Sequence, residues 1–119
     1  MLLGNIISEY YSRIDSCDIE WVIKLFAENA IYHRADSAYC GRNQIHKFFT
    51  DGRKIRGDHI LDSIWSFDHR VICTGTFKGV GAAGDPRKVG FSDFWAFDQK
   101  HLVVERQTYL ALGHQYVAE

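Results

Sequence analysis

The change from helix-like to strand-like sequence about halfway along the chain restricts its fold most. Leu3, Ile7, Tyr10 and Ile14 recur at helical spacing near the start, which predicts an amphipathic helix. Strand-like segments dominate later, over residues 59–67, 70–78, 89–97 and 102–112. Helices first and strands afterwards favour an α+β fold, with helices packed on one face of a curved antiparallel sheet.

Further segments complete the predicted order. Asp18 is a candidate N-cap for a second helix over residues 19–27, because its carboxylate can accept the first free N–H groups. A short strand over 30–34 and a third helix over 42–54 follow. The glycine-rich segment 79–86 holds the only proline and predicts a hairpin loop. The result is ααβαββββ in a single domain spanning residues 1–119, a size that can bury one core.

Composition narrows the classes of partner. The net charge is −1 and the basic residues are scattered, so a nucleic-acid surface is not expected. No apolar run approaches membrane-spanning length, and the first residues lack the pattern of a signal peptide. The three cysteines have no metal-ligand spacing, which predicts free thiols, a cytoplasmic location and no metal site. Aromatic residues make up 14% of the chain; most of them are expected to pack the core, and some can line an apolar ligand pocket.

Asp93 is the residue that the strand pattern singles out. The two-residue period places Phe91, Asp93, Trp95 and Phe97 on one face. An unpaired carboxylate among three large aromatics is costly, so we expect either a raised pKa and a neutral, proton-donating acid, or a structural carboxylate bonded to Tyr10 or to the backbone. Asp93 is therefore a catalytic candidate, and Trp95 a candidate for binding substrate.

The same period gives further candidates on other strands. It places Glu105 and Tyr109 on one face of the last strand, and His59 and Trp65 on one face of segment 59–67. Glu105 is either a spare acid or half of a surface ion pair. Arg34 could neutralise a carboxylate of the substrate, or could pair with Asp36 or Glu105.

Several short motifs resemble the nuclear-transport-factor-2-like superfamily, over nearly the whole chain. They are YY at residues 10–11, DSCDIEW at 15–21, LFAENAIY at 25–32, YCG at 39–41, the histidine at 59 and FSDFWAF at 91–97. The superfamily includes ketosteroid isomerase, scytalone dehydratase and the SnoaL-like cyclases. The resemblance implies a cone-shaped fold, in which three N-terminal helices pack on a curved sheet that encloses an apolar pocket.

Two members of the superfamily suggest roles for individual residues. Compared with ketosteroid isomerase, Tyr10 and Asp93 fall on the oxyanion-hole positions, but Arg34 replaces the general base and cannot act as one. Compared with scytalone dehydratase, His59 falls on a histidine at the start of a strand and Asp15 on the aspartate that holds it. Asp93 falls near an asparagine that contacts substrate. That enzyme's second pocket histidine is replaced near Gly75, and its pocket tyrosines by Ile14 and Arg34.

These matches imply a cofactor-independent lyase or isomerase with dehydratase-like chemistry. His59, oriented by Asp15, would remove a proton next to a carbonyl or assist loss of water. Asp93 with Tyr10 or Tyr109 would stabilise the enolate oxygen. The substrate implied is small, hydrophobic and oxygenated, such as a polyketide- or terpenoid-like intermediate.

Two other functions stay open at this point. One is a SnoaL-like cyclase or steroid-type isomerase that uses Asp93 as its main acid or base. The other is a non-catalytic module for ligand binding or dimerisation. Under all three we expect a homodimer, because the convex sheet face carries apolar residues such as Ile72 and Phe94 with no helix left to cover them.

Overall fold

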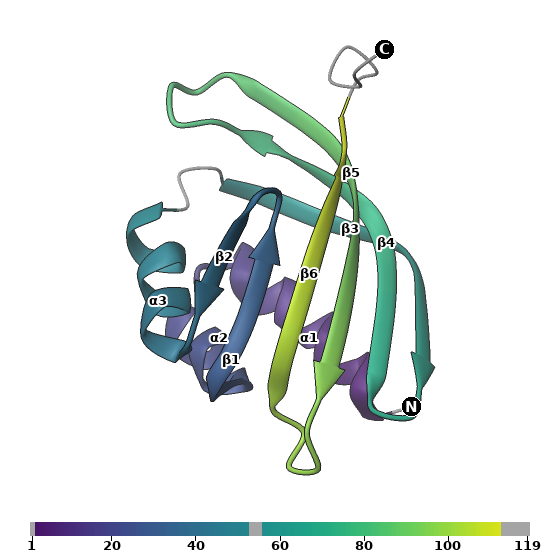
Figure 1. Ribbon diagram of the computed structural model, residues 1–119. Coiled ribbons are helices and arrows are strands. Elements are labelled where there is room, and N and C mark those ends of the chain that lie inside the picture. Colours follow the sequence, from purple (N-terminus) through teal and green to yellow (C-terminus); the bar gives the residue numbers. More distant parts are fainter. Residues whose placement is uncertain (1, 53–55, 113–119) are drawn as a thin grey trace, which may run out of the picture.

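The computed structural model describes residues 2–52 and 56–112 and has helices on one side of a curved sheet (Figure 1). The elements are α1 (Leu2–Asp15), α2 (Ile19–Leu25), β1 (Phe26–Arg34), β2 (Ser37–Cys40), α3 (Arg42–Lys47), a π-helical turn η1 (Phe48–Gly52), β3 (Arg56–Phe67), β4 (Arg70–Val80), β5 (Pro86–Phe97) and β6 (Val103–Ala111). This is the predicted α+β, cone-shaped architecture. None of the described helices is long and apolar enough to cross a membrane.

All six strands form one unclosed sheet in the order β2-β1-β6-β5-β4-β3. Neighbouring strands are antiparallel except β1 and β6, which run parallel. Consecutive strands from β3 to β6 are neighbours because short turns connect them, whereas β1 reaches β6 from the other end of the chain. The sheet therefore places residues of β1 beside residues of β6, about 70 positions later in the sequence.

The first half of the chain departs from the predicted boundaries. The Asp18 carboxylate accepts the Trp21 N–H at 3.3 Å, so Asp18 caps α2 as predicted, but the helix ends at Leu25 and β1 begins at Phe26. Strand β2 was not predicted. It pairs with β1 across a two-residue turn in which Ala35 has a φ of +54°, and alanine at such a position gives no turn signal. The third helix is α-helical only to Lys47 and continues as η1; residues 53 and 54 of the predicted helix lie outside the described part.

The core lies between α1 and the concave face of the sheet. The predicted stripe of α1 is buried at Leu3, Ile7, Tyr10, Tyr11 and Ile14. Tyr10 packs edge-on against Trp95 of β5, with ring centroids 4.8 Å apart. Each large apolar side chain buried in this way contributes about 1.5–3 kcal/mol, so this contact fixes α1 across the middle of the sheet.

Two strands contain β-bulges that change which side chains face the core. The pairing of β3 with β4 shifts between Leu61 and Ser63. The pairing of β5 with β6 shifts so that Phe97 pairs with Val103 while Ala96 pairs with Glu105. One extra residue reverses the inside–outside alternation of the rest of the strand. Each bulge therefore decides which side chains of the following part of its strand face the concave side of the sheet.

Candidate functional site

A cavity of about 570 Å³ lies between α1, η1 and the concave face of the sheet. Small-molecule sites in proteins usually have volumes of roughly 300–1,000 Å³. Its walls are mostly apolar, from Ile14, Phe48, Phe77, Val89, Phe91 and Leu110, and its polar groups include Tyr10, His59, Asp93, Arg106 and Thr108. An apolar enclosure with a few convergent polar groups is the usual form of a binding or catalytic site.

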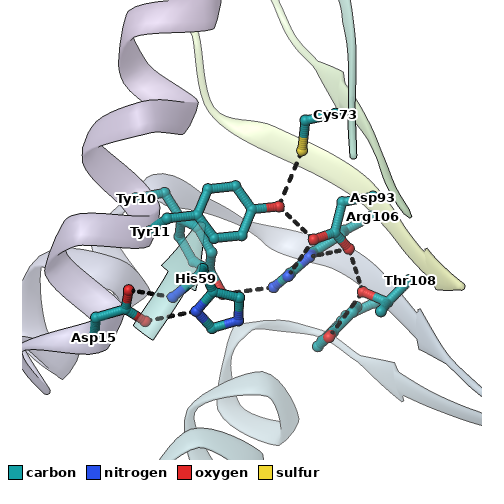
Figure 2. A network of polar contacts seen from close by, with 9 residues as sticks. Tyr10, Tyr11, Asp15, His59, Cys73, Asp93, Arg106 and Thr108 are labelled. Atoms are coloured by element: carbon teal, nitrogen blue, oxygen red, sulfur yellow. Dashed lines mark hydrogen bonds and ion pairs between the residues drawn. The ribbon is translucent and has the colours of Figure 1, made fainter. Parts of the chain in front are cut away.

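His59 is held in place by Asp15. Asp15 is the last residue of α1, and His59 follows the start of β3. The Asp15 carboxylate accepts the His59 backbone N–H at 2.7 Å and contacts ring Nδ1 at 2.5 Å (Figure 2). The predicted contact is therefore present. A carboxylate only accepts hydrogen bonds, so Nδ1 carries a proton, and the neutral ring has its lone pair on Nε2.

The imidazole ring is also fixed by its neighbours. Ring centroids of Tyr11, Phe77 and Phe91 lie 5.2, 4.8 and 5.3 Å from that of His59. The His59 side chain is 16% exposed and borders the cavity. Among the residues that the structure describes, none forms a hydrogen bond with Nε2. This nitrogen is the side of the ring available to a ligand.

Asp93 lies on the predicted face and is, of the two states expected, the structural hydrogen-bonded carboxylate, although its partners are not Tyr10 or the backbone. Its side chain is 1% exposed and pairs with Arg106, with Nη2 to Oδ2 at 2.9 Å and Nε to Oδ1 at 3.2 Å. The hydroxyls of Tyr11 and Thr108 donate to the same two oxygens (Figure 2). Every partner donates, so Asp93 is an ionised acceptor. The prediction of a neutral, proton-donating Asp93 is wrong, because a cation that the sequence pattern did not reveal lies beside it.

Arg106 is the main residue that the sequence prediction missed. Its guanidinium carbon lies 4.8, 4.5 and 4.3 Å from the ring centroids of Tyr10, Tyr32 and Trp95. Burial, the largest single effect, lowers its pKa, but the charge of Asp93 together with the surrounding tyrosine side chains outweighs burial and holds the pKa well above the usual value. Its Nη1 donates to the Tyr10 hydroxyl at 2.6 Å. Arg106 thus brings a fixed positive charge to the cavity wall.

A second layer of hydroxyl and thiol groups completes this network. Because Thr108 donates to Asp93, it accepts from the Tyr32 hydroxyl, with 3.0 Å between the oxygens. By the same logic the Tyr11 hydroxyl accepts from Cys73, 3.1 Å away. Burial, and then the Asp93 charge, raise the pKa of Tyr11 well above its usual value, so this donor keeps its proton. The chains Tyr32–Thr108 and Cys73–Tyr11 both donate toward Asp93 and hold the ion pair in one geometry.

Two of the remaining predicted site residues border the cavity. They are Tyr10 from α1 and Arg34 at the end of β1. Trp95 is 1% exposed and lies beneath Arg106; it does not line the cavity. It packs the core and supports the cation from below.

The other three predicted residues lie outside the cavity, and their assignment to it was wrong. Trp65 and Tyr109 are 56% and 54% exposed, and Glu105 is exposed and lies 3.2 Å from His33. The β3 bulge turns Trp65 outward, and the β6 bulge turns Glu105 and Tyr109 outward. The same shift turns Arg106 and Thr108 inward. A search for a basic partner to the buried Asp93 was the one sequence signal that could have found Arg106.

The site is suited to moving protons. It combines an oriented histidine with a nitrogen lone pair, a buried cation and several hydroxyl groups around one apolar space. Within residues 2–52 and 56–112, no three His, Cys, Asp or Glu side chains come together as metal ligands would.

A family model identifies the family of the chain, and solved structures share its fold. The family model for the SnoaL-like domain matches residues 7–106. A putative SnoaL-like polyketide cyclase from Shewanella denitrificans OS-217 superposes with a TM-score of 0.82 at 14% identity, over 92% of this chain and 90% of that one. No curated protein matches the sequence.

Two further solved structures have the same fold. SalBIII, an epoxide hydrolase/cyclase-like enzyme with a role in pyran ring formation in the polyether salinomycin, gives a TM-score of 0.83 at 12% identity, over 92% of this chain and 91% of that one. A Catenulispora acidiphila DSM 44928 protein with a ketosteroid isomerase-like fold, in complex with trimethylamine, gives 0.78 at 16% identity, over 90% and 85%. At these identities the likeness extends to the fold alone.

Proposed function

Because the chain belongs to the SnoaL-like domain family, we propose that it is a cofactor-independent lyase or isomerase with His59 as its general base. The substrate is a small, apolar, oxygenated molecule bound in the cavity. The observation that carries this proposal is the double contact of Asp15 with the backbone and ring of His59. A carboxylate that orients a histidine and fixes its tautomer is the arrangement that general-base catalysis requires.

The first step is removal of a proton from a carbon next to a carbonyl group. The proton passes to Nε2 of His59, and the electron pair of the C–H bond becomes that of an enolate. The resulting imidazolium is stabilised by the Asp15 carboxylate. In a dehydration the enolate then expels a β-hydroxyl group, which leaves as water with the proton from His59. In an isomerisation the proton returns to a different carbon.

The enolate oxygen is stabilised from the side of Arg106. Asp93 and Tyr10 take three of the five guanidinium N–H groups of Arg106. Donation from this cation also polarises the Tyr10 hydroxyl and strengthens it as a donor toward an oxygen in the cavity. A fixed charge that needs no rearrangement during the reaction is the most effective form of such stabilisation. In this mechanism Asp93 positions Arg106 and does not transfer a proton.

Ring closure is the second candidate reaction. It uses the same first step, after which the enolate carbon attacks a second carbonyl of the same molecule and the new alkoxide takes the proton from His59. The solved structures that favour it are the putative polyketide cyclase and SalBIII. It differs from the cyclase expected from the sequence in that His59, and not Asp93, is the base.

Proton exchange with a simple ketone tests the shared step without the natural substrate. We expect the protein to accelerate exchange of the α-protons of 2-tetralone in D2O, followed by NMR. His59→Gln should slow this exchange at least about 100-fold, the usual contribution of a general base. Asp15→Asn should also slow it, because the amide no longer fixes the Nδ1–H tautomer.

The matched control is His69→Gln, which changes an exposed histidine in the turn between β3 and β4. It should leave the exchange rate unchanged. Far-ultraviolet circular dichroism establishes that each variant is folded. A folded His59→Gln protein with the wild-type rate refutes His59 as the base. Binding of 2-tetralone without any accelerated exchange favours the non-catalytic ligand-binding module.

A further inference from the structure

The cavity carries more positive charge than the proposed reaction uses. Among the residues that the structure describes, four cationic side chains border it, from Arg34, Arg87, Lys88 and Arg106, and one carboxylate, from Asp93. Arg106 and Asp93 neutralise one another, and Arg87 pairs with Asp85 at 2.5 Å. Within the described part of the chain, neither Arg34 nor Lys88 forms an ion pair. The whole chain has a net charge of −1, so this excess is local to the cavity.

Arg34 is the more informative of these two cations. It is half-buried at the end of β1, and its guanidinium carbon lies 5.5 Å from the ring centroid of Phe48, which also borders the cavity. Neither carboxylate suggested by the sequence pairs with it. Glu105 contacts His33 instead, and in the described part of the chain no carboxylate oxygen lies within 4.0 Å of Arg34.

We infer that the cavity binds an organic anion whose carboxylate pairs with Arg34 and whose apolar body lies against the aromatic wall. A planar guanidinium can bind a carboxylate through two parallel hydrogen bonds. Such a pair offsets the cost of holding a partly desolvated cation without a partner. If His59 is the base of the proposed function, on which this assignment of substrate rests, the substrate is a hydrophobic keto acid or a similar carbonyl-containing carboxylate.

Binding of a matched pair of ligands tests the inference without turnover. The probes are 2-naphthoate and 2-naphthamide, which have nearly the same shape and differ in charge, and the measurement is isothermal titration calorimetry. We expect wild-type protein to bind naphthoate at least about tenfold more tightly than naphthamide, as a charge-assisted pair allows. Arg34→Gln should weaken naphthoate binding about tenfold and leave naphthamide unchanged. Arg70→Gln, at an exposed position at the start of β4, should change neither.

Four results would overturn the inference. The first two are that wild-type protein binds the two ligands with equal affinity, or binds neither. The third is that Arg34→Gln weakens the binding of both ligands equally. The fourth is that Lys88→Gln loses the preference for naphthoate while Arg34→Gln keeps it. The proposed function fails separately. His59→Gln should still prefer naphthoate to naphthamide. If this variant also exchanges protons at the wild-type rate, His59 is not the general base, and the anion site is unaffected. If wild-type protein accelerates proton exchange but does not prefer naphthoate, the anion site alone is refuted.

Discussion

The charged pair of Asp93 and Arg106 is almost completely buried at the cavity wall, with side chains 1% and 5% exposed. Removing two charges from water costs several kcal/mol each, and the pair persists only if hydrogen bonds and favourable contacts offset this cost. Two hydroxyl donors satisfy the carboxylate. The faces of three aromatic rings surround the guanidinium. Each charge therefore depends on the other.

Replacement of Arg106 should therefore strongly destabilise the protein. Arg106→Met keeps most of the side-chain volume but leaves Asp93 as a buried, uncompensated charge. We expect the free energy of unfolding to fall by about 3–5 kcal/mol, measured by urea denaturation. Arg13→Met is the matched control, because Arg13 pairs with Glu9 and Asp18 at the surface, where ion pairs contribute little, and the loss should be much smaller. Asp93→Asn added to Arg106→Met should recover part of the loss. If Arg106→Met and Arg13→Met lower the free energy of unfolding equally, the Asp93–Arg106 pair behaves as a surface ion pair would.

For helices and strands, the sequence predicts which side chains face the core where the periodicity is regular, but it does not predict the β-bulges that interrupt it. The stripe of α1 and the row of Phe91, Asp93, Trp95 and Phe97 lie where the sequence places them, because both elements keep one period throughout. The faces of β3 and β6 were assigned wrongly, because a bulge has no distinctive residue in either strand. Reading β6 as regular concealed Arg106.

The contact of Asp15 with His59 was predicted only through family resemblance. The two residues are 44 positions apart, and no spacing rule connects the end of one helix with the start of a strand so far away. The geometry depends on how α1 crosses β3, which tertiary packing decides. The sequence identifies the two groups by their chemistry, while the fold brings them together.

The close approach of the paired strands β3 and β4 at Gly57 and Gly79 requires glycine on both strands. A Cβ on Gly79 would lie 2.1 Å from the Arg56 carbonyl oxygen and 2.8 Å from the Gly57 Cα. Both are backbone atoms and cannot rotate away. We expect Gly79→Ala to destabilise the protein by about 1–3 kcal/mol, the usual cost of forcing extra volume into a packed contact.

Gly90→Ala provides the comparison within the same sheet. A Cβ there would have the side chain of Ala111 as its nearest neighbour, at 3.4 Å, so the change in unfolding free energy should stay within about 0.5 kcal/mol. Urea denaturation measures the free energy of unfolding of both variants. If Gly79→Ala is as stable as Gly90→Ala, the two strands can separate at this point without cost.

Over the whole molecule, the two faces of the sheet differ in what covers them. The helices lie on the concave side, and no described helix covers the convex face (Figure 1). Apolar side chains cross that face on four neighbouring strands. Trp65 pairs with Ile72, Ile72 pairs with Phe94, and the Phe94 and Tyr109 rings lie 5.5 Å apart. An exposed strip of this kind usually marks an interface.

We propose that the strip joins two copies of the chain in a homodimer, since a self-complementary sheet face suits a two-fold axis. Sedimentation velocity at micromolar concentration should give the mass of a dimer. Phe94→Lys, near the middle of the strip, should weaken association at least about 30-fold, as loss of a central aromatic contact does. Val80→Lys introduces the same charge at an exposed apolar residue at the end of β4, away from the strip, and should remain dimeric.

Because of its position, the strip can be changed to disrupt the dimer without changing the cavity. The cavity lies on the opposite side of the sheet, and neither Trp65 nor Phe94 borders it. A monomeric Phe94→Lys protein should therefore keep both its preference for naphthoate and its proton exchange with 2-tetralone. A wild-type protein that sediments as a monomer refutes the dimer. Loss of exchange in a folded, monomeric Phe94→Lys protein would instead mean that the second copy is needed to hold the sheet, and with it the cavity, in its active shape.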